Sequence, residues 1–245
     1  MEDKALLSTE VASGAEKAEL LIVIPAYNEA ENIERVVNHL TANFPQYDYV
    51  VVNDGSRDET AAICQRNGYN LLNLPVNLGL AGAFQAGLKY ADKYGYQYAV
   101  QLDGDGQHRP EYLESMIKKM EEGYDIVIGS RFVGEKKPFT RRMLGSNLIE
   151  LAIRFTTGVN IKDPTSGMRM FSKRMIREFA SGLNYGPEPD TVSYLIRQGA
   201  RVAEVPVIMD ERILGVSYLT PVNAMRYMLK MLISILLIQN FRKRR

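Results

Sequence analysis

Short apolar runs alternate with amphipathic stretches along the first half of the chain. The runs are rich in β-branched residues, as buried strands are, and they fall at 20–24, 49–52, 71–74, 98–102 and 125–128. Between them apolar residues recur every three or four positions, as at Ile33, Val37 and Leu40, and this spacing predicts helices with one buried face. Strands that alternate with helices predict an α/β fold with a doubly wound, mostly parallel sheet.

The second half has a less regular pattern. We expect a helix over about 146–155, a strand over 201–209 and, at 163–169, a turn that gathers acidic, hydroxyl and basic side chains. No repeat, low-complexity tract or linker divides the chain. We therefore expect a flexible tail at 1–19, one folded domain at 20–220 and a basic, amphipathic C-terminal helix at 221–245.

Composition and charge narrow the functional classes. The chain has 245 residues, of which 46% are hydrophobic and 24% charged, as in an ordinary globular protein. The net charge of +1 gives no reason to expect a nucleic-acid partner. One cysteine, Cys64, excludes an intrachain disulfide framework, and two histidines are too few for a histidine-built metal site. The first residues lack the apolar core of a signal peptide.

Polar side chains gather just after the predicted strands. Tyr27 and Glu29 follow the first strand, Asp54 ends the second, and Asp103 and Asp105 follow the fourth. Ligands of doubly wound sheets bind outside the carboxyl ends of the strands. These residues therefore predict one shared site at that edge of the sheet.

The stretch 102–107 (LDGDGQ) carries the clearest chemistry. Glycines separate Asp103, Asp105 and Gln107, so a sharp turn can aim two carboxylates and an amide oxygen at one point. Such hard oxygen ligands suit Mg²⁺ or Mn²⁺. The alternative is a plain polar turn whose aspartates cap the helix that begins near Pro110, because short acidic motifs are common.

Six motifs in order resemble those of the inverting family-2 glycosyltransferases, in the branch of dolichyl- and polyprenyl-phosphate sugar synthases. They are IPAYNEAENI at 24–33, VNDGSRDET at 52–60, LDGDGQHRP at 102–110, IGSRF at 128–132, DPTSGMR at 163–169 and RxxGxS at 212–217. The resemblance runs from about 20 to 218. It implies a GT-A-type, Rossmann-like fold, with a nucleotide-binding sheet and an acceptor-facing half.

The resemblance also implies an activity. A single sugar would pass, with inversion, from a nucleotide-sugar donor to a polyprenyl phosphate, either undecaprenyl or dolichyl. Mg²⁺ or Mn²⁺ held by Asp103, Asp105 and Gln107 would neutralise the departing diphosphate. The implied nucleotide-sugar positions are Pro25, Ala26, Tyr27, Glu29, Asp54, Asn77, Gly79 and Asp103. For Tyr27 the alternative is packing alone, and for Asp54 it is a plain turn residue.

A lipid phosphate is already anionic near neutral pH, so it needs cations that align it more than it needs a strong base. The resemblance implies that Arg131, Arg142 and Arg212 hold this phosphate and that Ser146 is a hydroxyl partner. It counts Arg131 and Arg212 with Asp103 and Asp105 as catalytic. A solvated basic face is the alternative for each arginine, and Arg169 either binds phosphate or braces Asp163.

Two other functions compete with this one. A family-2 enzyme of the same kind could act on a growing cell-wall or surface glycan. A silent binding protein on the same fold is disfavoured, because the acidic motif and Arg212 occur together. The segment 185–191 (YGPEPDT) departs from the mannose enzymes, since its two prolines interrupt an expected longer helix. Glu188 or Asp190 could face the sugar or the acceptor, so the sugar stays open.

The chain ends in an apolar helical pattern over 224–241, followed by RKRR at 242–245. The apolar run is shorter than the roughly 18 residues expected of a spanning helix. A basic end on such a helix predicts an interfacial helix on anionic lipid, or one docked on a small integral membrane partner. A core helix is the alternative. We therefore expect a peripheral protein on the cytoplasmic face of a membrane.

Overall fold

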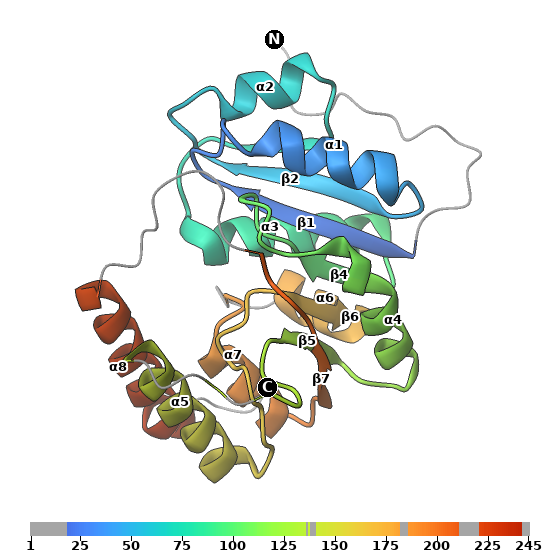
Figure 1. Ribbon diagram of the computed structural model, residues 1–245. Coiled ribbons are helices and arrows are strands. Elements are labelled where there is room, and N and C mark those ends of the chain that lie inside the picture. Colours follow the sequence, from blue (N-terminus) through green and yellow to red (C-terminus); the bar gives the residue numbers. More distant parts are fainter. Residues whose placement is uncertain (1–18, 136, 138–140, 182–185, 211–220, 242–245) are drawn as a thin grey trace.

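The computed structural model describes residues 19–135, 137, 141–181, 186–210 and 221–241 (Figure 1). Its centre is a seven-stranded sheet in the order β3-β2-β1-β4-β6-β5-β7. The strands are β1 (Leu20–Ala26), β2 (Asp48–Asp54), β3 (Leu71–Leu74), β4 (Tyr98–Gln101), β5 (Ile126–Ser130), β6 (Arg169–Ser172) and β7 (Val202–Pro206). All neighbours pair in parallel except β6, which runs antiparallel to β4 and β5. The predicted mostly parallel sheet is confirmed.

Helices cover both faces of this sheet (Figure 1). They are α1 (Ile33–Asn43), α2 (Thr60–Arg66), α3 (Gly79–Tyr94), α4 (Leu113–Glu121), α5 (Arg141–Thr157), α6 (Lys173–Ser181), α7 (Pro189–Arg197) and α8 (Pro221–Leu236), with short 3-10 turns at Pro110–Tyr112 and Ile238–Phe241. Alternate residues of β1 enter opposite cores: Leu21 and Val23 pack with α3, and Ile22 packs with α1 and α4. The strand is apolar throughout because both of its faces are buried.

The second half differs from its sequence pattern in three places. Arg169 is the first residue of β6, so the expected turn at 163–169 leads directly into a strand. The helices α6 and α7 were not expected, and Pro189 begins α7 at its first position, where proline fits a helix well. The C-terminal helix ends at Leu236 and gives way to a 3-10 turn. Within the described ranges, none of the helices has the length and apolar character needed to cross a bilayer.

Glycine allows α3 to lie directly on β1. Gly87 is on the inner face of α3, and a Cβ there would overlap Cγ1 of Val23 and approach its Cγ2 to 3.0 Å. Val23 is fully buried and β-branched, so it has little freedom to move away. This contact sets how closely the middle of α3 approaches the middle of β1.

We predict that Gly87→Ala lowers the free energy of unfolding by about 1–2 kcal/mol, because overpacking outweighs the helical preference of alanine. Urea unfolding measures the change. Lys89→Ala, on the exposed face of the same helix, should cost little. Val23→Ala should make Gly87→Ala much less harmful in the double variant. Equal losses with and without Val23 would contradict the contact.

Candidate functional site

A pocket of about 400 Å³ opens at the carboxyl ends of β1, β2 and β4 and beside the start of α3. The pocket is lined by all eight residues for which the family resemblance implies nucleotide-sugar binding, and by Asp105 of the predicted metal set. Leu80, Ala83 and Gly104 complete the lining and were not expected. The structure thus brings these residues together around one space, while their roles in binding stay predictions.

Hydrogen bonds lock the loops after β1 and β2 to one another. The backbone N–H of Asn28 donates to the Ser56 hydroxyl at 3.0 Å, and the Arg57 N–H donates to Oδ1 of Asn28 at 2.9 Å. The Glu29 N–H donates to the Thr60 hydroxyl at 2.9 Å. Asn28 has a φ of 56°, a left-handed conformation that asparagine tolerates. Two polar loops therefore form one rigid wall of the pocket.

Asp54 joins this wall to α3. Its side chain is almost fully buried, and its Oδ1 accepts the backbone N–H of Leu78 at 2.7 Å. The next residue, Gly55, has a φ of 64°, and a Cβ there would be 2.7 Å from the backbone nitrogen of Asn77. Asp54 therefore has a structural role in positioning the loop before α3, and its other oxygen can still accept a bond from a ligand.

Asp103 is held on two sides. Nε2 of Gln101 donates to its Oδ1 at 2.9 Å, and its own backbone N–H donates to Nδ1 of His108 at 3.0 Å. Because Nδ1 accepts, the neutral ring carries its proton on Nε2, which lies 3.6 Å from Oδ2 of Asp103. Gln101 and His108 are both buried. We call this arrangement the Asp103 clamp.

Sequence reasoning missed the clamp. The expected site residues include neither Gln101 nor His108. The one sequence feature that points to the clamp is a polar residue, Gln101, directly after the apolar Tyr98, Ala99 and Val100. In the structure Gln101 is 1% exposed. A buried amide at such a position needs a polar partner, and here the partner is the first acid of the motif.

The rest of the acidic turn is tied to neighbouring segments. The carbonyl of Asp105 accepts a bond from Nη2 of Arg35 at 3.0 Å, and its Oδ1 accepts the Gln107 N–H at 3.0 Å. Nε2 of Gln107 donates to the carbonyl of Asp210 at 3.1 Å, and Arg109 pairs with the Asp210 carboxylate. The amide nitrogen of Gln107 is thus occupied, which leaves its oxygen as the atom suited to a cation.

The donor set of this turn suits a divalent ion only in part. Among the described residues, no three side chains of the His, Cys, Asp and Glu types are grouped as a metal cage. Two carboxylates and one amide oxygen are an incomplete set of hard ligands. Such a set fits Mg²⁺ or Mn²⁺ when phosphate oxygens and water complete the coordination.

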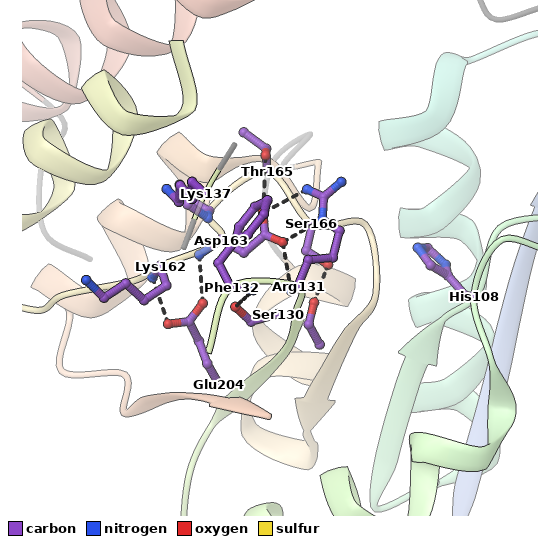
Figure 2. A network of polar contacts seen from close by, with 12 residues as sticks. His108, Ser130, Arg131, Phe132, Lys137, Lys162, Asp163, Thr165, Ser166 and Glu204 are labelled. Atoms are coloured by element: carbon purple, nitrogen blue, oxygen red, sulfur yellow. Dashed lines mark hydrogen bonds and ion pairs between the residues drawn. The ribbon is translucent and has the colours of Figure 1, made fainter. Parts of the chain in front are cut away.

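Arg131 is paired with an acid (Figure 2). Its Nε and Nη2 contact the two oxygens of Asp163 at 2.7 and 2.8 Å, and its backbone N–H donates to the same carboxylate at 3.1 Å. Asp163 is fully buried, while a quarter of the Arg131 side chain is exposed. Glu204 accepts the backbone N–H groups of Lys162 and Asp163 at 2.7 and 2.8 Å and so fixes the turn.

Arg169 follows neither of the two expected roles in its hydrogen bonds. It is buried, and it donates to the carbonyls of Pro164 and Pro187, the former at 2.6 Å. Burial lowers the pKa of this guanidinium, while the charge of Asp163 works in the opposite direction. Arg169 is a strut between the turn at 163–169 and the start of α7, and it is Arg131 that braces Asp163.

The other expected acceptor residues are not gathered by described contacts. Arg142 lies in α5 but its side chain is outside the described residues, and Arg212 lies in 211–220, also outside them. Ser146 is buried on α5, and its hydroxyl has no hydrogen-bond partner in the described part of the chain. The acceptor roles of these residues, like that of Arg131, stay predictions.

The two acids of the 185–191 segment differ in their surroundings. Asp190 accepts a bond from the hydroxyl of Ser234 in α8 at 2.6 Å, and its carbonyl accepts one from Gln239. Burial and the charge of Asp190 raise the pKa of Glu188. Asp190 therefore serves to hold α8 on α7, which is a structural role.

Comparison with known proteins gives concordant results. The family model "Glycosyl transferase family 2" matches residues 21–180. A polyprenol monophosphomannose synthase of Mycolicibacterium smegmatis is 32% identical over 223 residues, which cover 86% of this chain and 84% of the relative. An undecaprenyl-phosphate mannosyltransferase of Micrococcus luteus is 32% identical over 211 residues, covering 81% and 86%.

Solved structures share the fold at low identity. Glucosyl-3-phosphoglycerate synthase from Mycobacterium tuberculosis, in complex with Mn²⁺, UDP and glucosyl-3-phosphoglycerate, superposes with a TM-score of 0.64 at 20% identity. The match covers 91% of this chain and 80% of that one. A mannosyltransferase from Pyrobaculum calidifontis, with GDP-Man and Mn²⁺, gives 0.58 at 17% identity, covering 83% and 59%. These likenesses confirm the predicted GT-A-type fold.

We predict that Asp163→Ala lowers the free energy of unfolding by about 2–3 kcal/mol, because it leaves the guanidinium of Arg131 without its buried partner. Urea unfolding with a circular dichroism readout measures the loss. Arg174→Ala breaks the more exposed pair with Asp125 and serves as the control, with an expected loss below about 1 kcal/mol. Similar losses for both variants would show that the Arg131 pair is no stronger than a surface pair.

Proposed function

The chain belongs to glycosyl transferase family 2 and is a glycosyltransferase, and we propose that it transfers one sugar from a nucleotide to a polyprenyl phosphate. The observation that carries the proposal is the pocket at the strand ends, where eight residues of the family pattern meet the acidic turn. Relatives named for polyprenol and undecaprenyl phosphate match more than four-fifths of the chain and support this acceptor. The sugar and the nucleotide base stay open.

The donor would lie along the wall formed by the loops after β1 and β2. Carboxylate oxygens of Glu29 and Asp54 can accept hydrogen bonds from ribose hydroxyls or base N–H groups. One oxygen of Glu29 already accepts a bond from Asn32 at 2.8 Å, which fixes the direction of this carboxylate. Such preorganisation lowers the entropy cost of binding.

The diphosphate would lie over the acidic turn. Asp103, Asp105 and Gln107 would hold Mg²⁺ or Mn²⁺ there, and a bound ion neutralises charge on the departing nucleoside diphosphate. The clamp keeps the Asp103 carboxylate in one orientation before any ligand arrives. The structures of fold neighbours with Mn²⁺ support use of a divalent ion.

The transfer needs no strong general base from the protein, because the acceptor phosphate is already anionic. An oxygen of the acceptor phosphate forms a bond to the anomeric carbon, and the bond from that carbon to the donor phosphate breaks with both electrons left on the diphosphate. Attack opposite the leaving group inverts the anomeric configuration. Arg131, aligned by Asp163, would hold the acceptor phosphate through its remaining N–H groups. Arg142, Ser146 and Arg212 would complete this subsite.

The test of this function is a donor and acceptor screen. Purified protein would be incubated with Mn²⁺, radiolabelled nucleotide sugars and either undecaprenyl or dolichyl phosphate. Label in the organic phase supports the proposal. Label that appears only in aqueous glycan would favour a growing-glycan acceptor, and no transfer from any donor would refute both.

We predict that Asp105→Asn lowers turnover about a hundredfold or more, because one anionic ligand near the leaving diphosphate is lost. Electron paramagnetic resonance of Mn²⁺ should show weaker binding in the same variant. Asp92→Asn, on the exposed face near the end of α3, is the matched control and should behave like the parent chain. Parental Mn²⁺ affinity and turnover in Asp105→Asn would remove this residue from the metal site.

A further inference from the structure

Exposed apolar side chains are concentrated on two neighbouring helices. Of the fourteen large hydrophobic residues that are exposed in the described part of the chain, ten lie on α5, on α8 or just after α8. Phe155 is 83% exposed, Met225 70% and Leu151 61%. Scattered exposed apolar residues are ordinary, but a concentration of this kind marks an interaction surface.

The exposed residues form one stripe on each helix. On α5 they are Leu144, Leu148, Leu151 and Phe155, and on α8 they are Met225, Leu229, Ile233 and Leu236. Steps of three and four residues keep a stripe on one side of a helix. The opposite sides hold α5 and α8 in the core, where Ile153 and Met231 are fully buried.

The two stripes face the same way. The helices lie side by side and run in the same direction (Figure 1), and both reach α7 near their ends, where Thr156 meets Ser193 and Ser234 meets Asp190. Gly145 faces Met228, since a Cβ at Gly145 would be 2.8 Å from Cγ of Met228.

Leu144 precedes Gly145 by one residue, and Leu229 follows Met228 by one, a rotation of about 100° in each helix. In parallel helices these opposite offsets turn both stripes to the same side. We call this surface the α5–α8 face.

The sequences of the two helices that form the α5–α8 face carry mostly positive charge. The two helices contain five basic residues, namely Arg141, Arg142, Arg154, Arg226 and Lys230. Their one acid, Glu150, is already paired with Lys137 at 2.7 Å and with Lys162 at 3.5 Å. Four more basic residues follow at 242–245. Since the whole chain carries only +1, the remainder is net negative and the charge is strongly polarised.

We propose that the α5–α8 face docks flat on an anionic lipid bilayer. The apolar stripes would enter the boundary between headgroups and acyl chains, and the exposed Arg154 and Arg226, which adjoin Phe155 and Met225, would lie among the lipid phosphates. Positive charge disfavours a second copy of the same face as the partner, because like charges would be brought together. The purpose of this docking rests on the proposed function, since it delivers the enzyme to a lipid acceptor.

Point substitutions test the face better than truncation. Removal of the chain after Lys230 would delete the buried Met231 and Ile235 and expose the core that they cover. It would also leave Asp190 without Ser234 and Gln239, its two partners in the C-terminal segment. The variants are Leu151→Ser/Phe155→Ser on α5 and Met225→Ser/Leu229→Ser on α8. Val76→Ser/Ile208→Ser removes two apolar residues elsewhere, 58% and 61% exposed, and is the control. Circular dichroism and thermal melting establish that each variant is folded.

The full-length chain should float with vesicles of phosphatidylethanolamine and phosphatidylglycerol and bind phosphatidylcholine vesicles weakly. Each face variant should lower the partition coefficient about tenfold or more, while the control keeps it. Added salt should weaken binding of the parent chain, because the electrostatic attraction is screened. Folded face variants that float like the parent would overturn the proposal.

Two other outcomes would also overturn it. Loss of self-association in the face variants, seen by analytical ultracentrifugation of a parent that ignores vesicles, would make the face a contact between copies. Binding only to vesicles that carry a membrane protein would make it a protein-docking surface. Turnover on a short, water-soluble prenyl phosphate separates this proposal from the enzymatic one: folded face variants should retain it, and its absence in the parent would refute the activity without altering the flotation result.

Discussion

Parallel pairing of β2, β1 and β4 is the constraint on which the site depends. Ala26 at the end of β1 is paired with Asn53 of β2, one residue before Asp54. Gln101 is paired with Val23, so the chain beyond β4 continues alongside the last residues of β1. A Cβ at Gly104 would be 3.1 Å from the carbonyl oxygen of Pro25, so glycine lets the acidic turn lie against that strand. Three strand ends are thereby held at one edge, and their polar loops share a single pocket.

This edge of the sheet could be predicted from sequence because strands that are buried on both faces are continuous apolar runs. The continuous apolar runs of the first half give the strand ends to within a residue or two, and the polar residues after them line the pocket. The six ordered motifs then identified the family. The pocket lining follows from local pattern and a single rule of sheet topology.

The second half could not be predicted in the same way. β6 has only four residues, RMFS, and both of its end residues are polar, so the sequence shows no apolar run there. Its first residue is a buried arginine. The ion pair of Arg131 with Asp163 joins residues 32 positions apart in the sequence. The packing of α5 against α8 joins segments that are still further apart in the sequence. Contacts of this kind depend on tertiary packing, which hydrophobic periodicity does not encode. The Asp103 clamp is missed for a similar reason, since glutamine at the end of an apolar strand is informative only when its partner is known.

The clamp has a consequence for how this protein would respond to selection. Gln101 is buried, and while its amide nitrogen orients Asp103, its Oε1 has no hydrogen-bond partner among the described residues. A buried carbonyl without a partner costs free energy that an apolar residue of similar size would recover. At position 101 an apolar residue would therefore favour thermostability, while glutamine favours the orientation of Asp103 and so turnover. Selection for heat resistance alone would replace Gln101 with an aliphatic residue, and the resulting protein would be more stable but would orient the Asp103 carboxylate less well.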